Sequence, residues 1–393
     1  MSECITSPPL ELPGSALEHW MLSGDLVYLN HGSFGARLKA VHEHQEGLRE
    51  ALEASPVMGM DEDMVDHMPR IKSSLGSFLG MDHDGIGLVQ NASEAVCSVL
   101  RSIKFEPGDE IICTRHAYNA VLQLLRYISS RHDITLHVVD ITLPVSSREE
   151  VMTPVISRLG ERTRLVVVDQ VTSPTALVLP LSSLLAECRS RGIDTLVDGA
   201  HAPGMIELDI SSLGATWYAG NLHKWVCAPI GAGFLWTDPS RLDQTHPVII
   251  SHGYEEGYAQ EFDWQGTRDM TAWRTIPFVI DWVEDAWGWD TLRSHNSALA
   301  RWAHEMMTDA LAVEPLSPLD GCMLGSMAAM PLPPGIQERF EDLQSMQKCL
   351  RHEHRIEVPI MELGDRWFVR VSAQAYNRPG DYESLVHALQ QMA

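Results

Sequence analysis

Residues 163–204 read TRLVVVDQVTSPTALVLPLSSLLAECRSRGIDTLVDGAHAPG. Two runs rich in β-branched residues, 163–169 and 194–198, favour β-strands. The stretch between them, 181–191, is apolar on one side and polar on the other at helical spacing. A strand, a helix and a second strand in this order are typical of two parallel strands joined by a crossover helix.

The same alternation extends toward the N-terminus. Further strands are predicted at 85–90, 110–114 and 135–140, and further helices at 93–104, 118–131 and 148–159. This pattern predicts an α/β fold with a mostly parallel central sheet sandwiched by helices. Such sheets bind ligands beyond the carboxyl ends of their strands, so functional residues are expected there.

The C-terminal third has a different pattern. Two long helices are predicted within 271–311, and proline-rich breaks follow at 315–320 and 331–335. The predicted elements that close the chain are a strand, a helix at 336–350, strands at 355–360 and 367–372, and a helix at 382–391. We therefore expect three parts, which are an N-terminal arm (1–30), a large α/β domain (31–285) and a small C-terminal α+β domain with its linking helices (286–393).

Composition excludes several classes of protein. The 393 residues are 45% apolar, which is enough for a large core, and they carry a formal charge of −24. So acidic a surface repels nucleic acid and anionic lipid, and no apolar run approaches the roughly 18–20 residues that cross a bilayer. The first residues lack a basic segment followed by an apolar one, and the seven cysteines form no CxxC pair. We expect a cytoplasmic protein with reduced thiols and with neither nucleic-acid nor membrane partners.

Two residues point to a specific chemistry. Asp198 stands at the end of an apolar strand, where a buried carboxylate needs a cationic partner. Lys224 follows a second apolar strand in WYAGNLHKWVCAPIGAGFL (217–235), and a desolvated lysine becomes a nucleophile toward aldehydes. Pyridoxal phosphate requires both groups, a lysine for its aldehyde and a carboxylate for its ring nitrogen.

The motifs DGAHAPG (198–204) and NLHKW (221–225) resemble the class V aminotransferase group of fold-type I pyridoxal phosphate enzymes. Four more motifs narrow the resemblance to the isopenicillin N epimerase-like branch, which also contains C–S lyases that act on cysteine S-conjugates. They are YLNHGSFG (28–35), CAPIGAGFLW (227–236), QGTRD (265–269) and RVSAQAYN (370–377). The resemblance covers the chain from about residue 26 to its end.

The resemblance implies a role for each matching residue. Lys224 would bond to the cofactor aldehyde, Asp198 would pair with the ring nitrogen, and His116 would lie over the ring; these three are the expected catalytic residues. The other expected cofactor-binding residues are Ala92, Ser93, Ser173, His201, Asn221, His223 and, reaching the phosphate of the neighbouring subunit, Thr267. The expected substrate-binding residues are Asn30, His31, Tyr118, Arg268 from the partner chain, and Arg370, which would hold the α-carboxylate.

The reaction expected is removal of the Cα proton of a bound amino acid, with the resulting charge spread into the cofactor ring. The later steps stay open. We favour β-elimination from a cysteine S-conjugate over epimerisation, because no residue pair identifies a second proton donor; Tyr118 and His31 are the candidates for one. Transamination, decarboxylating deamination and an inactive scaffold of the same fold are further alternatives. The expected assembly is a homodimer with a shared active site.

The sequence argues against two kinds of site, a metal site and a persulfide-forming cysteine. The HEH runs at 42–44 and 352–354 lack the i, i+4 histidine spacing of HExxH, so no metal site is expected. Cysteine desulfurases use a mobile cysteine shortly before the carboxylate-binding arginine, and residues 350–370 contain none. Persulfide formation is therefore disfavoured.

Overall fold

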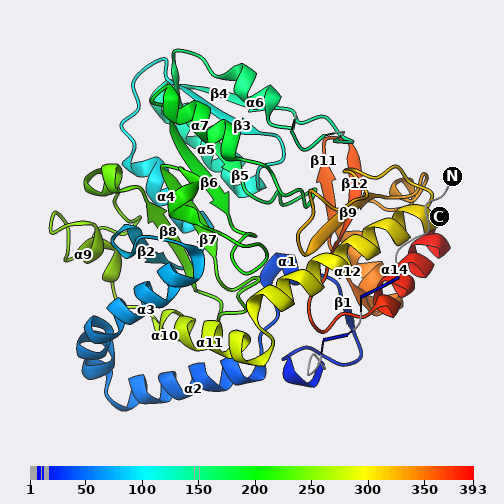
Figure 1. The fold of residues 1–393 in the computed structure, drawn as a ribbon, viewed down its shortest axis with the longest axis horizontal. Coiled ribbons are helices and arrows are strands. Elements are labelled where there is room, and N and C mark those ends of the chain that lie inside the picture. The colour runs from blue at the N-terminus through cyan, green and yellow to red at the C-terminus, as the bar shows by residue number, and fades with distance from the viewer. Residues whose placement is uncertain (1–6, 10, 13–16, 146, 150) are drawn as a thin grey trace.

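The computed structural model describes residues 7–9, 11–12, 17–145, 147–149 and 151–393, and for residues 61–65 only the backbone is described. Figure 1 shows a large sheet with helices on both faces, and a smaller sheet beside the C-terminal helices. The strands of the large sheet are β2 (Ile86–Val89), β3 (Glu110–Thr114), β4 (Thr135–Val139), β5 (Thr163–Asp169), β6 (Asp194–Gly199), β7 (Trp217–Asn221) and β8 (Gly233–Thr237).

The order of these strands is β2-β8-β7-β6-β5-β3-β4. β8 runs antiparallel to both of its neighbours, and every other pair is parallel. The mostly parallel central sheet expected from the sequence is thus confirmed. The carboxyl ends of β5, β6 and β7 lie side by side at one edge, where Asp169, Asp198 and Asn221 lie at or next to the strand ends.

Both faces of the sheet are buried, because alternate side chains of a strand point in opposite directions. Leu165 and Val167 of β5 pack in one cluster with α4 (Ala92–Ser102) and α5 (Asn119–His132). Val166 and Val168 pack on the other face with α6 (Thr153–Arg158) and α7 (Ser182–Ser190). Each fully buried aliphatic side chain of this kind contributes about 1.5–3 kcal/mol of transfer free energy.

The N-terminal segment joins the C-terminal part of the chain. β1 (Val27–Tyr28) pairs in parallel with β10 (Ile356–Glu357). The smaller sheet has the order β11-β12-β9, with β9 (Met327–Pro331), β11 (Ile360–Leu363) and β12 (Arg366–Ser372), all antiparallel. The remaining α-helices are α1 (His31–Phe34), α2 (Lys39–Ala54), α3 (Asp63–Leu79), α8 (Ile210–Leu213), α9 (Tyr258–Asp263), α10 (Thr271–Arg274), α11 (Ile276–Ala286), α12 (Trp289–Ala310), α13 (Leu343–Glu353) and α14 (Pro379–Met392).

Several predicted elements are shorter or divided. The two long helices expected within 271–311 are three, because Pro277 lies in the first turn of α11 and Gly288, at a φ of 74°, precedes α12. The helix expected at 336–350 begins only at Leu343, after a capping box at Asp342. The strand expected at 355–360 is divided between β10 and β11, which pair with different strands. The boundaries expected at 30/31 and 285/286 stay predictions.

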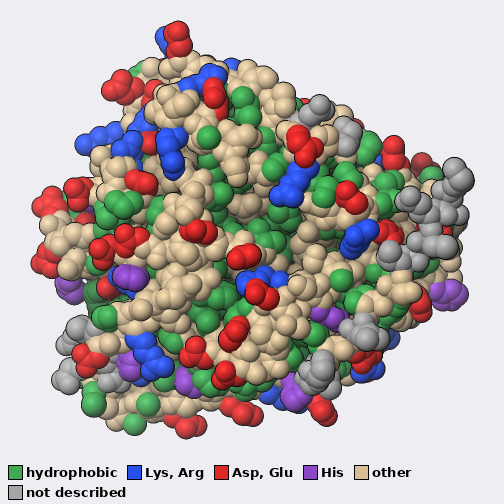
Figure 2. All heavy atoms as spheres, viewed as in Figure 1, with side chains coloured by type: hydrophobic (Ala, Val, Ile, Leu, Met, Phe, Trp, Pro, Cys, Tyr) green, Lys and Arg blue, Asp and Glu red, His purple; other side chains and the backbone are tan. Residues whose placement is uncertain are grey.

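Among the described residues, no helix is long and apolar enough to cross a membrane. Figure 2 shows acidic side chains spread over the visible face rather than gathered in one patch.

Candidate active site

Lys224 lies in the loop between β7 and β8, and its side chain is directed at the end of β6. Its Nζ is 3.1 Å from Nε2 of His201. Burial and the positive charge of Arg370 lower the pKa of Lys224 to about 7, although the negative charge of Asp198 opposes the shift. A large share of the Lys224 side chains is therefore a neutral amine near pH 7, which is the nucleophilic form.

Asp198 lies near the end of β6 and is buried, and its Oδ1 accepts a hydrogen bond from the Ala200 amide at 3.0 Å. Burial raises the pKa of Asp198, and the charge of Lys224 opposes that shift. Asp169 on β5 is its register partner and is equally buried. Burial and the charge of Asp198 raise the pKa of Asp169 well above its usual range. Because burial disfavours the ionised form of both carboxyls, a cationic ring nitrogen bound beside them would stabilise the charged form of Asp198.

His116 is buried, and both of its ring nitrogens have partners. Nδ1 is 2.7 Å from Oγ1 of Thr175 and Nε2 is 3.1 Å from the carbonyl oxygen of Ile141. A carbonyl only accepts hydrogen bonds, so Nε2 carries the proton and Nδ1 accepts from the threonine. Burial lowers the pKa of His116. The His116 ring is thus neutral and fixed in orientation. These properties suit a ring that stacks over the cofactor better than a group that donates a proton.

Arg370 on β12 is only 2% exposed, and no described carboxylate forms an ion pair with it. One guanidinium nitrogen donates to the carbonyl oxygen of Ser173 at 2.6 Å, another donates to Oγ of Ser33 at 3.0 Å, and Nε is buried without a partner. Burial lowers the pKa of Arg370 to about 10, so the group stays charged at neutral pH. A buried cation without a counter-ion is costly, and an incoming carboxylate would supply the missing charge.

Ala92 and Ser93, two of the expected cofactor-binding residues, lie where α4 begins. Asn91 caps the helix by accepting from the Glu94 amide, and Oδ1 of Asn221 accepts from the Ala92 amide at 2.8 Å. Ser93 is exposed beside them. The first turn of a helix presents amide groups and a positive dipole end, both of which favour an anion.

His201 and His223 lie beside Lys224, and the rings of both are neutral. Burial first, and then the charges of Lys224 and Arg370, lower the pKa of His201 well below its usual range. Burial lowers the pKa of His223 to about 4. Nδ1 of each ring is buried without a partner among the described residues. Each ring therefore has a polar atom available for a ligand.

The structure buries two of the expected substrate-binding residues, whose contacts with a substrate stay predictions. His31 lies behind the lysine loop, where its Nε2 is 3.1 Å from the Lys224 carbonyl oxygen. Asn30 is buried as well and accepts a hydrogen bond from Ser33, the residue that contacts Arg370. Tyr118, 47% exposed at the start of α5, lies close enough to Arg370 to affect its pKa.

Two residues, Thr267 and Arg268, are expected to act across a subunit interface. Thr267 is exposed and lines a cavity of about 990 Å³ with mostly apolar neighbours such as Val57, Met60 and Trp264. Arg268 is held within its own chain, where it pairs with Glu94 at 3.5 Å. Neither placement tests the expected contacts with a partner chain.

Sequence reasoning missed Asp169 and Ser33. The signal for Asp169 was present, because TRLVVVD ends in an aspartate and the next strand also carries one near its end. Ser33 lies inside YLNHGSFG, but nothing in the sequence shows that its hydroxyl faces Arg370.

One described cluster resembles a metal site. Ligand atoms of Cys349, Glu353 and His354 lie within 4.8 Å of one another at the end of α13. A hydrogen bond to Glu353 helps to raise the pKa of the Cys349 thiol, after burial and the carboxylate charge, so the thiol has a partner without an ion. Glu353 and His354 belong to the second HEH run, at which no metal site is expected from the sequence.

The α/β fold, with helices on both faces of its sheet, and the side chains around Lys224 are those expected of an enzyme that works through a lysine amine. The chain belongs to the class V aminotransferase family, whose model matches residues 38–383. It is similar to isopenicillin N epimerase of Streptomyces clavuligerus, with 30% identity over 385 residues that cover 94% of this chain and 95% of the relative. It is also similar to putative L-cysteine desulfhydrase 1 of Oryza sativa subsp. japonica, with 30% identity over 404 residues that cover 93% and 82%.

A solved structure of the same fold is a C-DES variant with glycine covalently linked to its pyridoxal phosphate cofactor. The TM-score is 0.79 at 19% identity, covering 93% of this chain and 96% of that one. These findings confirm the resemblance, the fold-type I architecture and the pyridoxal phosphate cofactor. The names of the relatives, lyases and epimerases, match the class of enzyme expected from the sequence.

The residues present fit this cofactor. Lys224 offers an amine of lowered pKa, Asp198 a buried carboxylate, and His201 and His223 one unpartnered ring nitrogen each. The start of α4 offers amide groups to a phosphate. Together these groups match an aldehyde, a ring nitrogen, a ring hydroxyl and a phosphate.

We predict that Lys224 in the cofactor-free chain reacts with acetic anhydride with a midpoint near pH 7. Burial disfavours its charged form, so its neutral amine is available at lower pH than that of a solvated lysine. Competitive labelling at a series of pH values, followed by peptide mass spectrometry, measures the midpoint, with Lys348 on α13 as internal reference. A midpoint for Lys224 equal to that for Lys348 would contradict the prediction.

Proposed function

We propose that the chain cleaves the C–S bond of a cysteine S-conjugate by pyridoxal phosphate-dependent β-elimination. The proposal depends on one observation: the site has an amine that can accept a proton, whereas two neighbouring histidines already use their ring nitrogens in hydrogen bonds. The amine of Lys224 is available for proton transfer, whereas His116 and His31 each use both ring nitrogens in hydrogen bonds within the protein.

Each residue has one task in this proposal. Arg370 would hold the α-carboxylate, because it is buried, charged and without a described acidic partner. Lys224 would take the proton from Cα through Nζ. Asp198 would keep a negative charge beside the ring nitrogen. The chemistry that the bound cofactor supplies is an electron-withdrawing ring that stabilises the charge left at Cα.

The elimination balances with water as the one further reagent. The Cα–H electron pair becomes the second bond between Cα and Cβ, the Cβ–S bond breaks, and sulfur leaves as a thiolate with the bonding pair. The three-carbon fragment is hydrolysed to pyruvate and ammonia. Lys224 takes the Cα proton in this proposal, because burial and the charge of Arg370 lower the pKa of its amine to about 7.

Incubation with cysteine S-conjugates in D2O tests the proposal. Release of equal amounts of thiol and pyruvate supports it. Exchange of the Cα hydrogen for deuterium with racemisation, and without pyruvate, contradicts it and supports epimerisation instead. The control is the same incubation with alanine, which has no leaving group at Cβ and should release no pyruvate by this route.

Epimerisation is the second candidate. Two observations favour it, the 30% identity to an epimerase over nearly the whole chain and the exposed phenol of Tyr118 close to Arg370. Inversion requires a second acid on the face opposite Lys224. With His31 and His116 engaged, Tyr118 is the remaining candidate among the three.

We predict that Tyr118→Phe retains at least about half of the pyruvate release, because elimination needs no second acid. If the enzyme is an epimerase, the same variant loses inversion by about 10²-fold or more while Cα exchange through Lys224 continues. Pyruvate release and the optical rotation of recovered substrate measure the two outcomes. A severe loss of pyruvate release with normal Cα exchange would show that Tyr118 assists departure of the leaving group.

We also propose a cytoplasmic homodimer in which Thr267 reaches the partner's cofactor phosphate. Support comes from the exposed, mostly apolar cavity that Thr267 lines and from the six described cysteines, all of which are free. Mixing Lys224→Ala chains with Thr267→Ala chains tests the shared site. Recovery of activity in the mixture supports it, and a monomer at micromolar concentration in light scattering contradicts it.

A further inference from the structure

His31 is buried beneath the lysine loop, among residues brought together from three distant segments. Its Nε2 is 3.1 Å from the Lys224 carbonyl oxygen, and its Nδ1 is 3.0 Å from the Tyr376 hydroxyl and 3.2 Å from the Ala36 amide nitrogen. Its ring lies 4.8 Å from the Trp225 ring, centre to centre. The fit of these partners leaves the ring of His31 little freedom to turn.

The hydrogen-bond partners fix the tautomer of His31. The Ala36 amide is a donor and the Lys224 carbonyl is an acceptor, so the proton belongs on Nε2 and Nδ1 accepts. The side-chain nitrogen of Gln374 also lies 3.3 Å from Nε2, but an amide nitrogen accepts no hydrogen bond, so the Nε2 proton is directed at the Lys224 carbonyl. The Tyr376 hydroxyl then donates to Nδ1 as well. In the opposite tautomer, a proton on Nδ1 would point at the Ala36 N–H, and the lone pair of Nε2 would point at the Lys224 carbonyl oxygen. Burial lowers the pKa of His31 to about 3, so the ring stays neutral at working pH.

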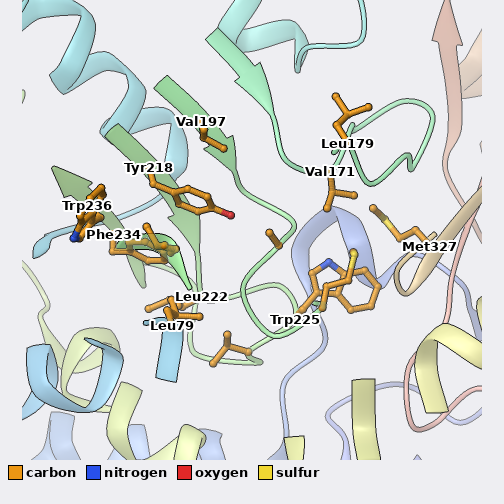
Figure 3. Packing of buried hydrophobic residues seen from close by; sticks show 14 of the residues in the cluster. Leu79, Val171, Leu179, Val197, Tyr218, Leu222, Trp225, Phe234, Trp236 and Met327 are labelled. Atoms are coloured by element: carbon orange, nitrogen blue, oxygen red, sulfur yellow. The ribbon is translucent and has the colours of Figure 1, made fainter. Parts of the chain in front are cut away.

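The short helix that carries His31 packs directly on the backbone of the lysine loop. A Cβ at Gly35 would lie 2.0 Å from the His223 carbonyl oxygen and 3.1 Å from Cα of Lys224. A Cβ at Gly32 would lie 2.4 Å from Sδ of Met327, and Figure 3 shows Met327 close to the Trp225 ring. Only residues without a side chain allow this approach, so α1 closely limits the position of residues 223–225.

The backbone of the lysine loop is bent close to Lys224. Cys227 has a φ of 62°, in the left-handed region, and its amide donates to the Lys224 carbonyl at 3.1 Å. The carbonyl thus accepts two hydrogen bonds, one from inside the loop and one from His31. The second ties the loop to α1 and, through Tyr376, to the segment after Arg370 on β12.

We propose that His31 is a positioning residue for Lys224: its Nε2–H holds the Lys224 carbonyl and so directs Nζ toward His201 and Asp198. The inference rests on Lys224 being the reactive amine and holds for elimination and epimerisation alike. It also explains why one C-terminal segment, 370–376, carries both the expected carboxylate receptor and a residue that orients His31.

His31→Leu tests the inference, because leucine fills much of the volume and lacks the donor. In the cofactor-free chain we expect the acetic anhydride midpoint of Lys224 to rise by about one pH unit or more, as Nζ gains freedom to reach water. In the holoenzyme we expect kcat to fall about tenfold or more with KM little changed, because Arg370 is untouched. His31→Gln, which keeps an N–H donor at similar reach, should restore most of both readouts.

His304→Leu is the matched control. His304 is a fully buried histidine on α12, the helix that packs beside the smaller sheet. Its replacement should leave the Lys224 midpoint and kcat per bound cofactor as in the wild type, whatever it does to the melting temperature. A folded His31→Leu chain that behaves like this control overturns the inference. If His31→Leu fails to fold, Tyr376→Phe decides, since loss of the Nδ1 donor should shift both readouts in the same direction and an unchanged midpoint refutes the proposal.

Discussion

Lys224→Ala should lower turnover by about 10⁴-fold or more, because in the proposed mechanism the change removes both the amine that bonds to the cofactor and the base that takes the Cα proton. This expectation depends on the position of the Lys224 side chain as well as on the NLHKW motif. Nζ lies 3.1 Å from His201, and burial with the charge of Arg370 lowers the pKa of the amine to about 7. The described part of the site offers no second lysine to replace it.

Two measurements separate loss of chemistry from loss of structure. Borohydride reduction followed by peptide mass spectrometry should attach the cofactor to the peptide that contains residue 224 in the wild type and to no peptide in the variant. Melting temperature should change little, since a smaller neutral side chain replaces a buried amine. Lys348→Ala, on α13 and away from the site, is the matched control and should keep full activity. Turnover by Lys224→Ala within tenfold of the wild type would remove Lys224 from the mechanism.

The fold was largely predictable because β-branched runs and helical periodicity are local signals. The seven strands of the central sheet lie within or next to the apolar runs in the sequence, and α4, α5 and α7 lie where amphipathic stretches predict them. The errors occur where one residue overrides the pattern. Pro277 divides the first of the two predicted long helices, and the cap at Asp342 delays the start of α13.

The identities of the site residues were predictable from the sequence, but the directions in which their side chains point were not. The sequence motifs indicate Lys224, Asp198 and Arg370 as separate residues, and the structure supplies their common surroundings, including the interaction of charges between Lys224 and Arg370. His31 shows the limit. A histidine in HGSFG is equally compatible with a pocket and with a buried support, because the direction of its side chain depends on Trp225 and Tyr376, which are far away in the sequence.

Arg370→Ala should raise KM for the amino acid by about 10²- to 10³-fold, the size of effect expected when one partner of a buried, hydrogen-bonded charge pair is removed. The guanidinium is 2% exposed, has no described acidic partner and donates to Ser173 and Ser33. Those two contacts aim the group without neutralising it. In the proposed function the α-carboxylate of the substrate is the counter-ion that completes the site, so its binding energy should be lost with the arginine.

Arg370→Lys distinguishes charge from geometry. A single ammonium is unable to contact Ser33, Ser173 and both carboxylate oxygens at once, so we expect KM to recover only in part. The decisive readout is discrimination between an amino acid and the corresponding amine that lacks the α-carboxylate. The wild type should bind the amino acid far more tightly, whereas Arg370→Ala should bind the two almost equally. If Arg370→Ala keeps the wild-type preference for the amino acid, the carboxylate is held elsewhere, and Arg370 serves instead to tie β12 to the loop at Ser173.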